Sequence, residues 1–241
     1  MSSARGGRTA TNTNTDSRST DLTETVARLI ERSWKGVVIV IAAVAVIVLF
    51  FVIWEPIQSG VEERGAEQAE IAQAMFDAWQ AETDAAERDT LAAQLTAQVS
   101  AILDEYDGRY AAERALYIRG QFHFEQEDWQ LAENDWMAVV EAAGGSYLAG
   151  LALYNAAIAA EEAGDPATAI ARLQDVVEAY THTPLPARAL FGEGRIRELA
   201  GDVEAARAAY QQLEEVYPGS DWATQARNRI LSLGIREPAE G

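Results

Sequence analysis

The stretches "EAGDPATAI" (residues 162–170) and "LAGDVEAAR" (residues 199–207) carry the same pattern 37 residues apart. Each contains a Gly-Asp pair, and each has an alanine five residues after the glycine. Another 37 residues upstream, "QEDWQLAEN" (residues 126–134) has Glu127-Asp128 in the same place, followed by Ala132. A fixed period of this length indicates an array of repeated structural units.

Other positions in the 37-residue frame also keep their character through the three copies. One position is always small, and a second position sixteen residues later is always large and apolar. This pattern is expected if the small residue lets one element approach its neighbour closely. The small residues are Gly120, Ala157 and Gly194, and the large ones are Trp136, Leu173 and Tyr210.

Each unit is predicted to be a hairpin of two helices. After the turn at Gly164, Ala169, Leu173 and Val176 follow helical spacing and share one face. Glycine suits the end of the first helix, where a left-handed residue closes the last turn. Asp165 can accept hydrogen bonds from the first free amides of the second helix. The sequence therefore predicts an all-α fold.

These positions resemble the tetratricopeptide repeat (TPR) pattern, with a small residue at position 8, alanine at position 20 and a bulky residue at position 24. Two features depart from it: the period is 37 rather than 34, and Leu153 stands where tryptophan is usual. "VYPGSDWATQARNRI" resembles the longer TPR-like repeats of bacterial envelope proteins. The resemblance covers roughly residues 90–233. It implies a TPR-like α-solenoid over residues 55–234 with a C-terminal capping helix, followed by a frayed tail at residues 235–241.

A transmembrane helix is predicted at Gly36 to Trp54, a run of 19 uncharged residues. At about 1.5 Å per residue, such a helix is about 28 Å long, close to the thickness of the bilayer interior. The alternatives are a buried core helix and a cleaved signal peptide. The run is apolar on every face, which disfavours the first alternative. It follows 35 residues and has no small-x-small cleavage site after it, which disfavours the second.

The flanks of this segment predict its orientation. Six basic residues precede it, whereas the next twenty residues contain only Arg64 among five glutamates. The positive-inside rule then places the N-terminus in the cytoplasm and the repeats in the periplasm, with the protein in the inner membrane. Residues 1–20 are polar and are expected to be a disordered cytoplasmic tail. Residues 21–35 are predicted to form a juxtamembrane amphipathic helix. This helix either continues directly into the transmembrane segment or lies on the membrane surface.

Composition argues against nucleic acid as a partner and against catalysis. From residue 55 onward there are 34 acidic residues, 13 arginines and no lysine, and no basic patch to hold a phosphate backbone. The two histidines, His123 and His182, have no metal-ligand spacing to other residues, and the chain has no cysteine. No hydrolase or metalloprotease motif occurs. We expect no enzyme, no metal and no cofactor.

The first helices of TPR units line a concave face, so the resemblance implies a peptide groove there. Position 5 of these helices is aromatic in all three copies, and arginines occupy positions 2 and 9. The rings would supply apolar area and the arginines would pair with carboxylates of an extended or helical peptide. The alternative is that the rings pack between repeats. The candidate groove residues are Tyr117, Tyr154, Phe191, Arg114, Arg188 and Arg195.

The order of segments, with a basic N-terminus, one span and an exported TPR-like domain, resembles the YfgM-like ancillary subunits of the Sec translocon. This resemblance implies protein partners such as the translocon, exported clients or envelope assembly factors, and contact with the lipid bilayer through Gly36 to Trp54. A membrane-anchored scaffold is therefore the leading hypothesis. The alternative is a structural component of the envelope that acts by self-association.

Overall fold

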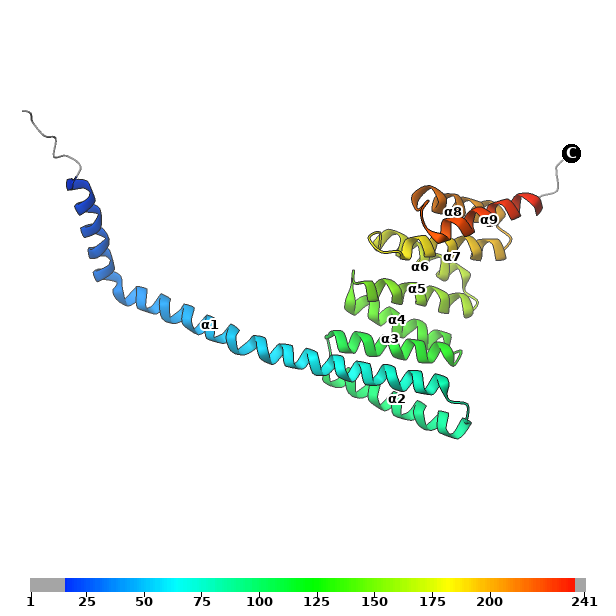
Figure 1. Ribbon diagram of the computed structural model, residues 1–241, viewed down its shortest axis with the longest axis horizontal. Coiled ribbons are helices and arrows are strands. Elements are labelled where there is room, and N and C mark those ends of the chain that lie inside the picture. The colour runs from blue at the N-terminus through cyan, green and yellow to red at the C-terminus, as the bar shows by residue number, and fades with distance from the viewer. Residues whose placement is uncertain (1–15, 237–241) are drawn as a thin grey trace, which may run out of the picture. The chain divides into compact units, whose positions relative to one another are not determined.

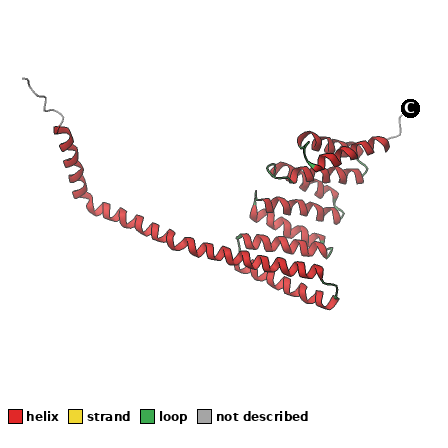
Figure 2. Cartoon of the chain, viewed as in Figure 1, coloured by secondary structure: helices red, strands yellow, loops and turns green. Residues whose placement is uncertain are grey.

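The computed structural model describes residues 16–236, and all regular structure in this range is helical (Figure 2). Side chains are described from residue 34 onward, apart from residues 37, 51, 53–59 and 235–236. The helices are α1 (Asp16–Ala81), α2 (Ala85–Glu105), α3 (Tyr110–Glu125), α4 (Trp129–Ala143), α5 (Tyr147–Glu162), α6 (Pro166–Ala179), α7 (Leu185–Leu199), α8 (Val203–Val216) and α9 (Asp221–Arg236).

The chain divides into two compact units, Met1–Ser59 and Gly60–Gly241, with the boundary inside α1. In the first unit, the described apolar side chains of α1 are exposed, as at Val40 and Ile41, each 62% accessible. Within the described part of the chain, no helix is long and apolar enough to cross a membrane. The predicted span includes four residues, 37, 51, 53 and 54, whose side chains lie outside the described ones. The span remains a prediction.

The second unit is a stack of helical hairpins in chain order (Figure 1). Each helix from α2 to α8 packs on the next one in the chain, and α9 also packs on α7. The helices α3 and α5 both begin on tyrosine, at Tyr110 and Tyr147, one 37-residue period apart. The expected all-α, TPR-like solenoid is confirmed.

The turns within the hairpins form as the Gly-Asp pairs predict. Gly164 and Gly201 have φ angles of +81° and +80°, in the left-handed region that glycine adopts without steric cost. The carboxylates of Asp165 and Asp202 then accept from backbone amides in the next helix, at 3.0 and 3.2 Å. These side chains therefore satisfy amides that the helix itself cannot pair.

The small positions of the frame are explained by the rings that lie against them. A Cβ atom at Gly120 would lie 2.6 Å from Nε1 of Trp136, and one at Gly194 would overlap the ring of Tyr210. In the middle repeat, the same pair of positions holds Ala157 and the smaller Leu173, both fully buried in one cluster. Residue size is therefore complementary within each hairpin.

Helix boundaries differ from expectation at both ends of the chain. The first helix begins at Asp16, inside the segment expected to be disordered, and residues 1–15 lie outside the described residues. The same helix continues through the predicted juxtamembrane helix and span. The last helix continues through Gly234 to Arg236, because Gly234 does not adopt the left-handed conformation that would end it. Residues 237–241 of the predicted frayed tail also lie outside the described residues.

Candidate functional site

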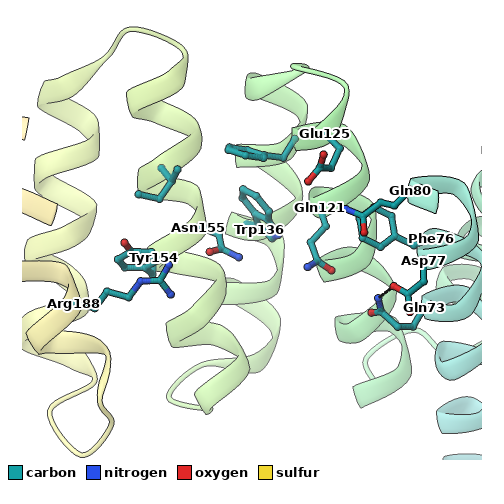
Figure 3. A pocket seen from close by; sticks show the side chains of 12 residues that line it. Gln73, Phe76, Asp77, Gln80, Gln121, Glu125, Trp136, Tyr154, Asn155 and Arg188 are labelled. Carbon is teal, nitrogen blue, oxygen red and sulfur yellow. Dashed lines mark hydrogen bonds between the residues drawn. The ribbon is translucent and has the colours of Figure 1, made fainter. Parts of the chain in front are cut away.

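A cavity of about 360 Å³ lies across the first helices of successive hairpins in the second unit. Its lining comes from the C-terminal part of α1 and from α3, α4, α5 and α7, and Figure 3 shows it from close by. We call it the groove. Its lining residues are Gln73, Phe76, Asp77, Gln80, Gln121, Phe124, Glu125, Trp136, Tyr154, Asn155, Ile158 and Arg188.

One end of the groove is formed by Tyr154 on α5 and Arg188 on α7. The guanidinium carbon of Arg188 lies 4.2 Å from the centre of the Tyr154 ring, a cation–π contact. Tyr154 is only 7% exposed, whereas Arg188 is exposed. No carboxylate among the described residues forms an ion pair with Arg188. Its charge is therefore available to a ligand.

Tyr117 on α3 contacts two residues that line the groove, Trp136 and Asn155. Its ring centre is 6.4 Å from that of Trp136, and its hydroxyl accepts a hydrogen bond of 2.8 Å from the amide of Asn155. Burial raises the pKa of Tyr117, although Asn155 and the charge of Arg188 oppose the shift. The hydroxyl therefore stays neutral, and it holds Asn155 in place beside the groove.

The three aromatic residues at position 5 do not form one continuous binding surface. Phe191 packs against Tyr210 and against Trp222 of the capping helix α9, with ring centres 5.6 and 5.2 Å apart. Of the three, only Tyr154 is among the residues that line the groove. Packing between helices accounts for Tyr117 and Phe191, and peptide binding by any of the three stays a prediction.

The three candidate arginines also differ in their surroundings. Arg114 pairs with Glu70 of α1. Arg195 pairs with Glu161 of α5, with Nη1 donating to Oε1 at 2.6 Å, and this pair raises the pKa of Arg195. Because their charges are already matched, Arg114 and Arg195 are less able than Arg188 to recruit an anionic ligand.

Several groove residues were missed by the sequence reasoning although the frame contains them. Ile158 and Gln121 occupy the same position as Arg195, one and two periods upstream respectively, and both line the groove. The frame therefore indicates this position, although only its charged member, Arg195, carries a sequence signal for binding a carboxylate. Gln73 and Asp77 on α1 had no such signal, because the frame does not extend that far upstream.

Nothing among the described residues resembles a metal centre, since no three His, Cys, Asp or Glu residues are grouped to hold an ion. His123 lies close to one acidic residue, with Nδ1 2.9 Å from an oxygen of Asp135. Arg119 also donates to both oxygens of Asp135, so this carboxylate is used within the fold. The absence of metal, cofactor and catalysis stays a prediction.

Comparison with known proteins identifies a family for part of the chain. Residues 154–221 match the tetratricopeptide repeat family, a range that runs from α5 to the first residue of α9. No curated protein matches the chain. Together with the stacked helical hairpins, this match over residues 154–221 supports a TPR-like protein.

Proposed function

We propose that the groove binds a segment of a partner protein, and that the chain presents this groove from a membrane. The TPR-like repeats by themselves indicate a scaffold for protein–protein interaction. The observation that carries the proposal further is Arg188, an exposed cation without an acidic partner among the described residues, held over the buried ring of Tyr154. A cavity of about 360 Å³ has a volume typical of ligand sites.

The ligand is an extended or helical peptide that carries a carboxylate. An aspartate, a glutamate or a chain terminus would pair with the guanidinium of Arg188, which offers several N–H donors in one plane. The guanidinium of Arg188 is already held against the ring of Tyr154, so the Arg188 side chain loses less conformational entropy when a ligand binds. The acidic surface of the domain would repel acidic segments that do not reach this arginine.

The test of the groove is a charge reversal at Arg188. Arg188→Glu is expected to lower crosslinking between the groove and partner segments about tenfold or more, because it replaces attraction by repulsion. A photoreactive residue placed at Ile158 in native membranes, followed by mass spectrometry, measures this loss and identifies the partners. If the main crosslinked product were instead a homo-oligomer of this chain, the result would favour the alternative that the protein acts by self-association.

The matched control is Arg88→Glu. Arg88 also lies over an aromatic ring, at 4.3 Å from Trp79, but it is on α2 and does not line the groove. The two variants change charge equally, so thermal melting should report similar small effects on stability. Equal crosslinking by Arg88→Glu and Arg188→Glu would argue against the groove.

The membrane anchor in this proposal is the segment from Gly36 to Trp54. Its support is the run of 19 uncharged residues, together with the exposure of described side chains such as Ile39 (67%) and Val46 (65%). Apolar surface of this extent is unfavourable in water and favourable in a bilayer. The basic residues before it favour a cytoplasmic N-terminus and a periplasmic domain.

This arrangement suits a scaffold that meets protein segments at the outer face of the inner membrane. Partners of that kind include the translocon, exported clients and envelope assembly factors. The order of segments and the TPR-like domain support this placement, and the crosslinking experiment distinguishes among the three.

A further inference from the structure

The end of the groove opposite Arg188 carries acidic side chains in place of a basic one. Figure 3 shows Gln73, Asp77 and Gln80 on one side of this end and Glu125 across from them. Asp77 accepts a hydrogen bond of 2.8 Å from the amide of Gln73, which holds the carboxylate in place. This end therefore presents carboxylates, whereas the other end presents an arginine.

The carboxylates of Asp77 and Glu125 form no ion pair within the described structure, although many other carboxylates of the domain pair with arginines. Arginines pair with at least six acidic residues, including the buried Glu133, Asp135 and Glu193. Among the described residues, none forms an ion pair with Asp77 or Glu125. Both line the groove and both are exposed, so a ligand can reach them.

Two further features of this end favour a cationic ligand. Phe76, Phe124 and Trp136 line the same cavity, and aromatic faces attract cations and cover the methylene stem of a long side chain. The amide oxygen of Gln121, another lining residue, is shielded from solvent and receives no hydrogen bond within the described structure. An acceptor in this state is normally matched by a donor.

We propose that this end of the groove binds a lysine or arginine side chain of the partner segment, between Asp77 and Glu125. The inference rests on the proposed function, that the groove binds peptides. The ligand is then a segment with a cation at the α1–α3 end and a carboxylate at the α5–α7 end. Such a pair of charges fixes the direction in which the segment lies.

The test uses the full chain in detergent micelles and two peptide libraries. Both are arrays of twelve-residue peptides, acetylated and amidated at their ends, with one fixed lysine in the first and N-acetyl-lysine in its place in the second. The wild-type protein is expected to bind the strongest lysine peptides about tenfold more tightly than their acetylated counterparts. The double variant Asp77→Asn, Glu125→Gln is expected to bind the two alike.

The control is the double variant Glu87→Gln, Asp89→Asn on α2, where both residues are exposed and neither lines the groove. It removes the same charge and should keep the lysine preference. Equal binding of both libraries by the wild type, or an unchanged preference in the groove variant, would overturn the cation site. If the cation site is overturned in this way, loss of peptide binding in Arg188→Glu would still support the proposal that the groove binds peptides. No binding to either library, or binding that Arg188→Glu leaves unchanged, would overturn the groove itself and the cation site with it.

Discussion

Glu127 stands where the other two repeats have glycine, and it adopts the same left-handed backbone conformation, with φ of +63°. For a residue with a Cβ atom this conformation costs about 1–2 kcal/mol. The following Asp128 makes no side-chain hydrogen bond to cap α4, unlike Asp165 and Asp202 in the equivalent turns. The first of these turns is therefore the weakest of the three.

Replacing Glu127 by glycine should stabilise the domain. We expect the free energy of unfolding to rise by about 0.5–1 kcal/mol, because relief of the steric cost exceeds the extra backbone entropy of glycine in the unfolded chain. Thermal melting followed by circular dichroism measures the change. The control is Gly164→Ala, which introduces a Cβ atom at φ of +81° and should destabilise by a similar amount. A lower melting temperature for Glu127→Gly would contradict the argument.

Asp135 is a buried charge that the fold keeps ionised. It is 7% exposed, and Arg119 donates to its two oxygens at 3.0 and 2.6 Å. Burial raises the pKa of Asp135, but hydrogen bonds from His123 and Arg119 and their charges together outweigh burial and hold it below the usual 3.8. A carboxyl group whose pKa is lowered by folding stabilises the fold above its unfolded pKa, and this contribution is lost as pH falls through the folded value.

Asp135→Asn should therefore be destabilising in a pH-dependent way. We expect a loss of about 1–3 kcal/mol near pH 7, since Arg119 would keep a charge without its partner. The gap between variant and wild type should narrow below about pH 4, because there the carboxylate of the wild type becomes protonated in the unfolded chain before it does in the folded one. Urea unfolding at several pH values measures it, with the exposed Asp175→Asn as control. A gap that stays constant from pH 7 to pH 3 would count against the charged cluster.

At the scale of the helical hairpin, each repeat matches a small residue on its first helix to a large one on its second. Gly194 lies against the fully buried ring of Tyr210, whereas the middle repeat pairs Ala157 with Leu173. Sequence reasoning predicted both positions, because they depend on the period alone. It did not connect the size of one residue to the size of its partner, although both columns were visible in the frame.

Gly194→Ala should destabilise the domain by about 1–3 kcal/mol through overpacking against Tyr210. The double variant Gly194→Ala, Tyr210→Leu recreates the pair of the middle repeat, so its loss should be smaller than the sum of the two single losses. Chemical unfolding of the four proteins gives the coupling energy. Simple additivity would show that the two positions are independent, against the packing seen in the structure.

The groove was harder to predict than the hairpins because its lining depends on neighbours that do not repeat. Phe191 has the same frame position as Tyr154, yet α9 follows only the last repeat and its Trp222 packs against the ring. At the other end, Asp77 lies on a helix outside the 37-residue frame, so counting along the sequence could not assign it. Arg188 could be predicted from the frame, but its lack of an acidic partner required the structure.

For the whole molecule, charge divides the chain at the predicted span. The residues up to Trp54 include six basic and four acidic side chains, whereas the remainder has a net charge of −21. Moving the acidic domain rather than the short basic segment across the inner membrane is the arrangement that the positive-inside rule favours. The groove would then face the compartment in which exported proteins arrive.

The topology can be tested with protease added to intact spheroplasts. If Gly36 to Trp54 spans the membrane with the N-terminus inside, the protease should remove the TPR-like domain and spare a tag fused before Met1, because the bilayer shields only the cytoplasmic side. After lysis, the same protease should also remove the tag, which shows that the tag itself is sensitive.

Reversing the flanking charges, by changing Arg28, Arg32 and Lys35 to glutamate, should reduce the fraction of chains whose N-terminal tag is protected, since these residues favour a cytoplasmic N-terminus. Protection of the domain, a mature chain that starts after residue 54, or full release of the domain by carbonate washing would argue against the span.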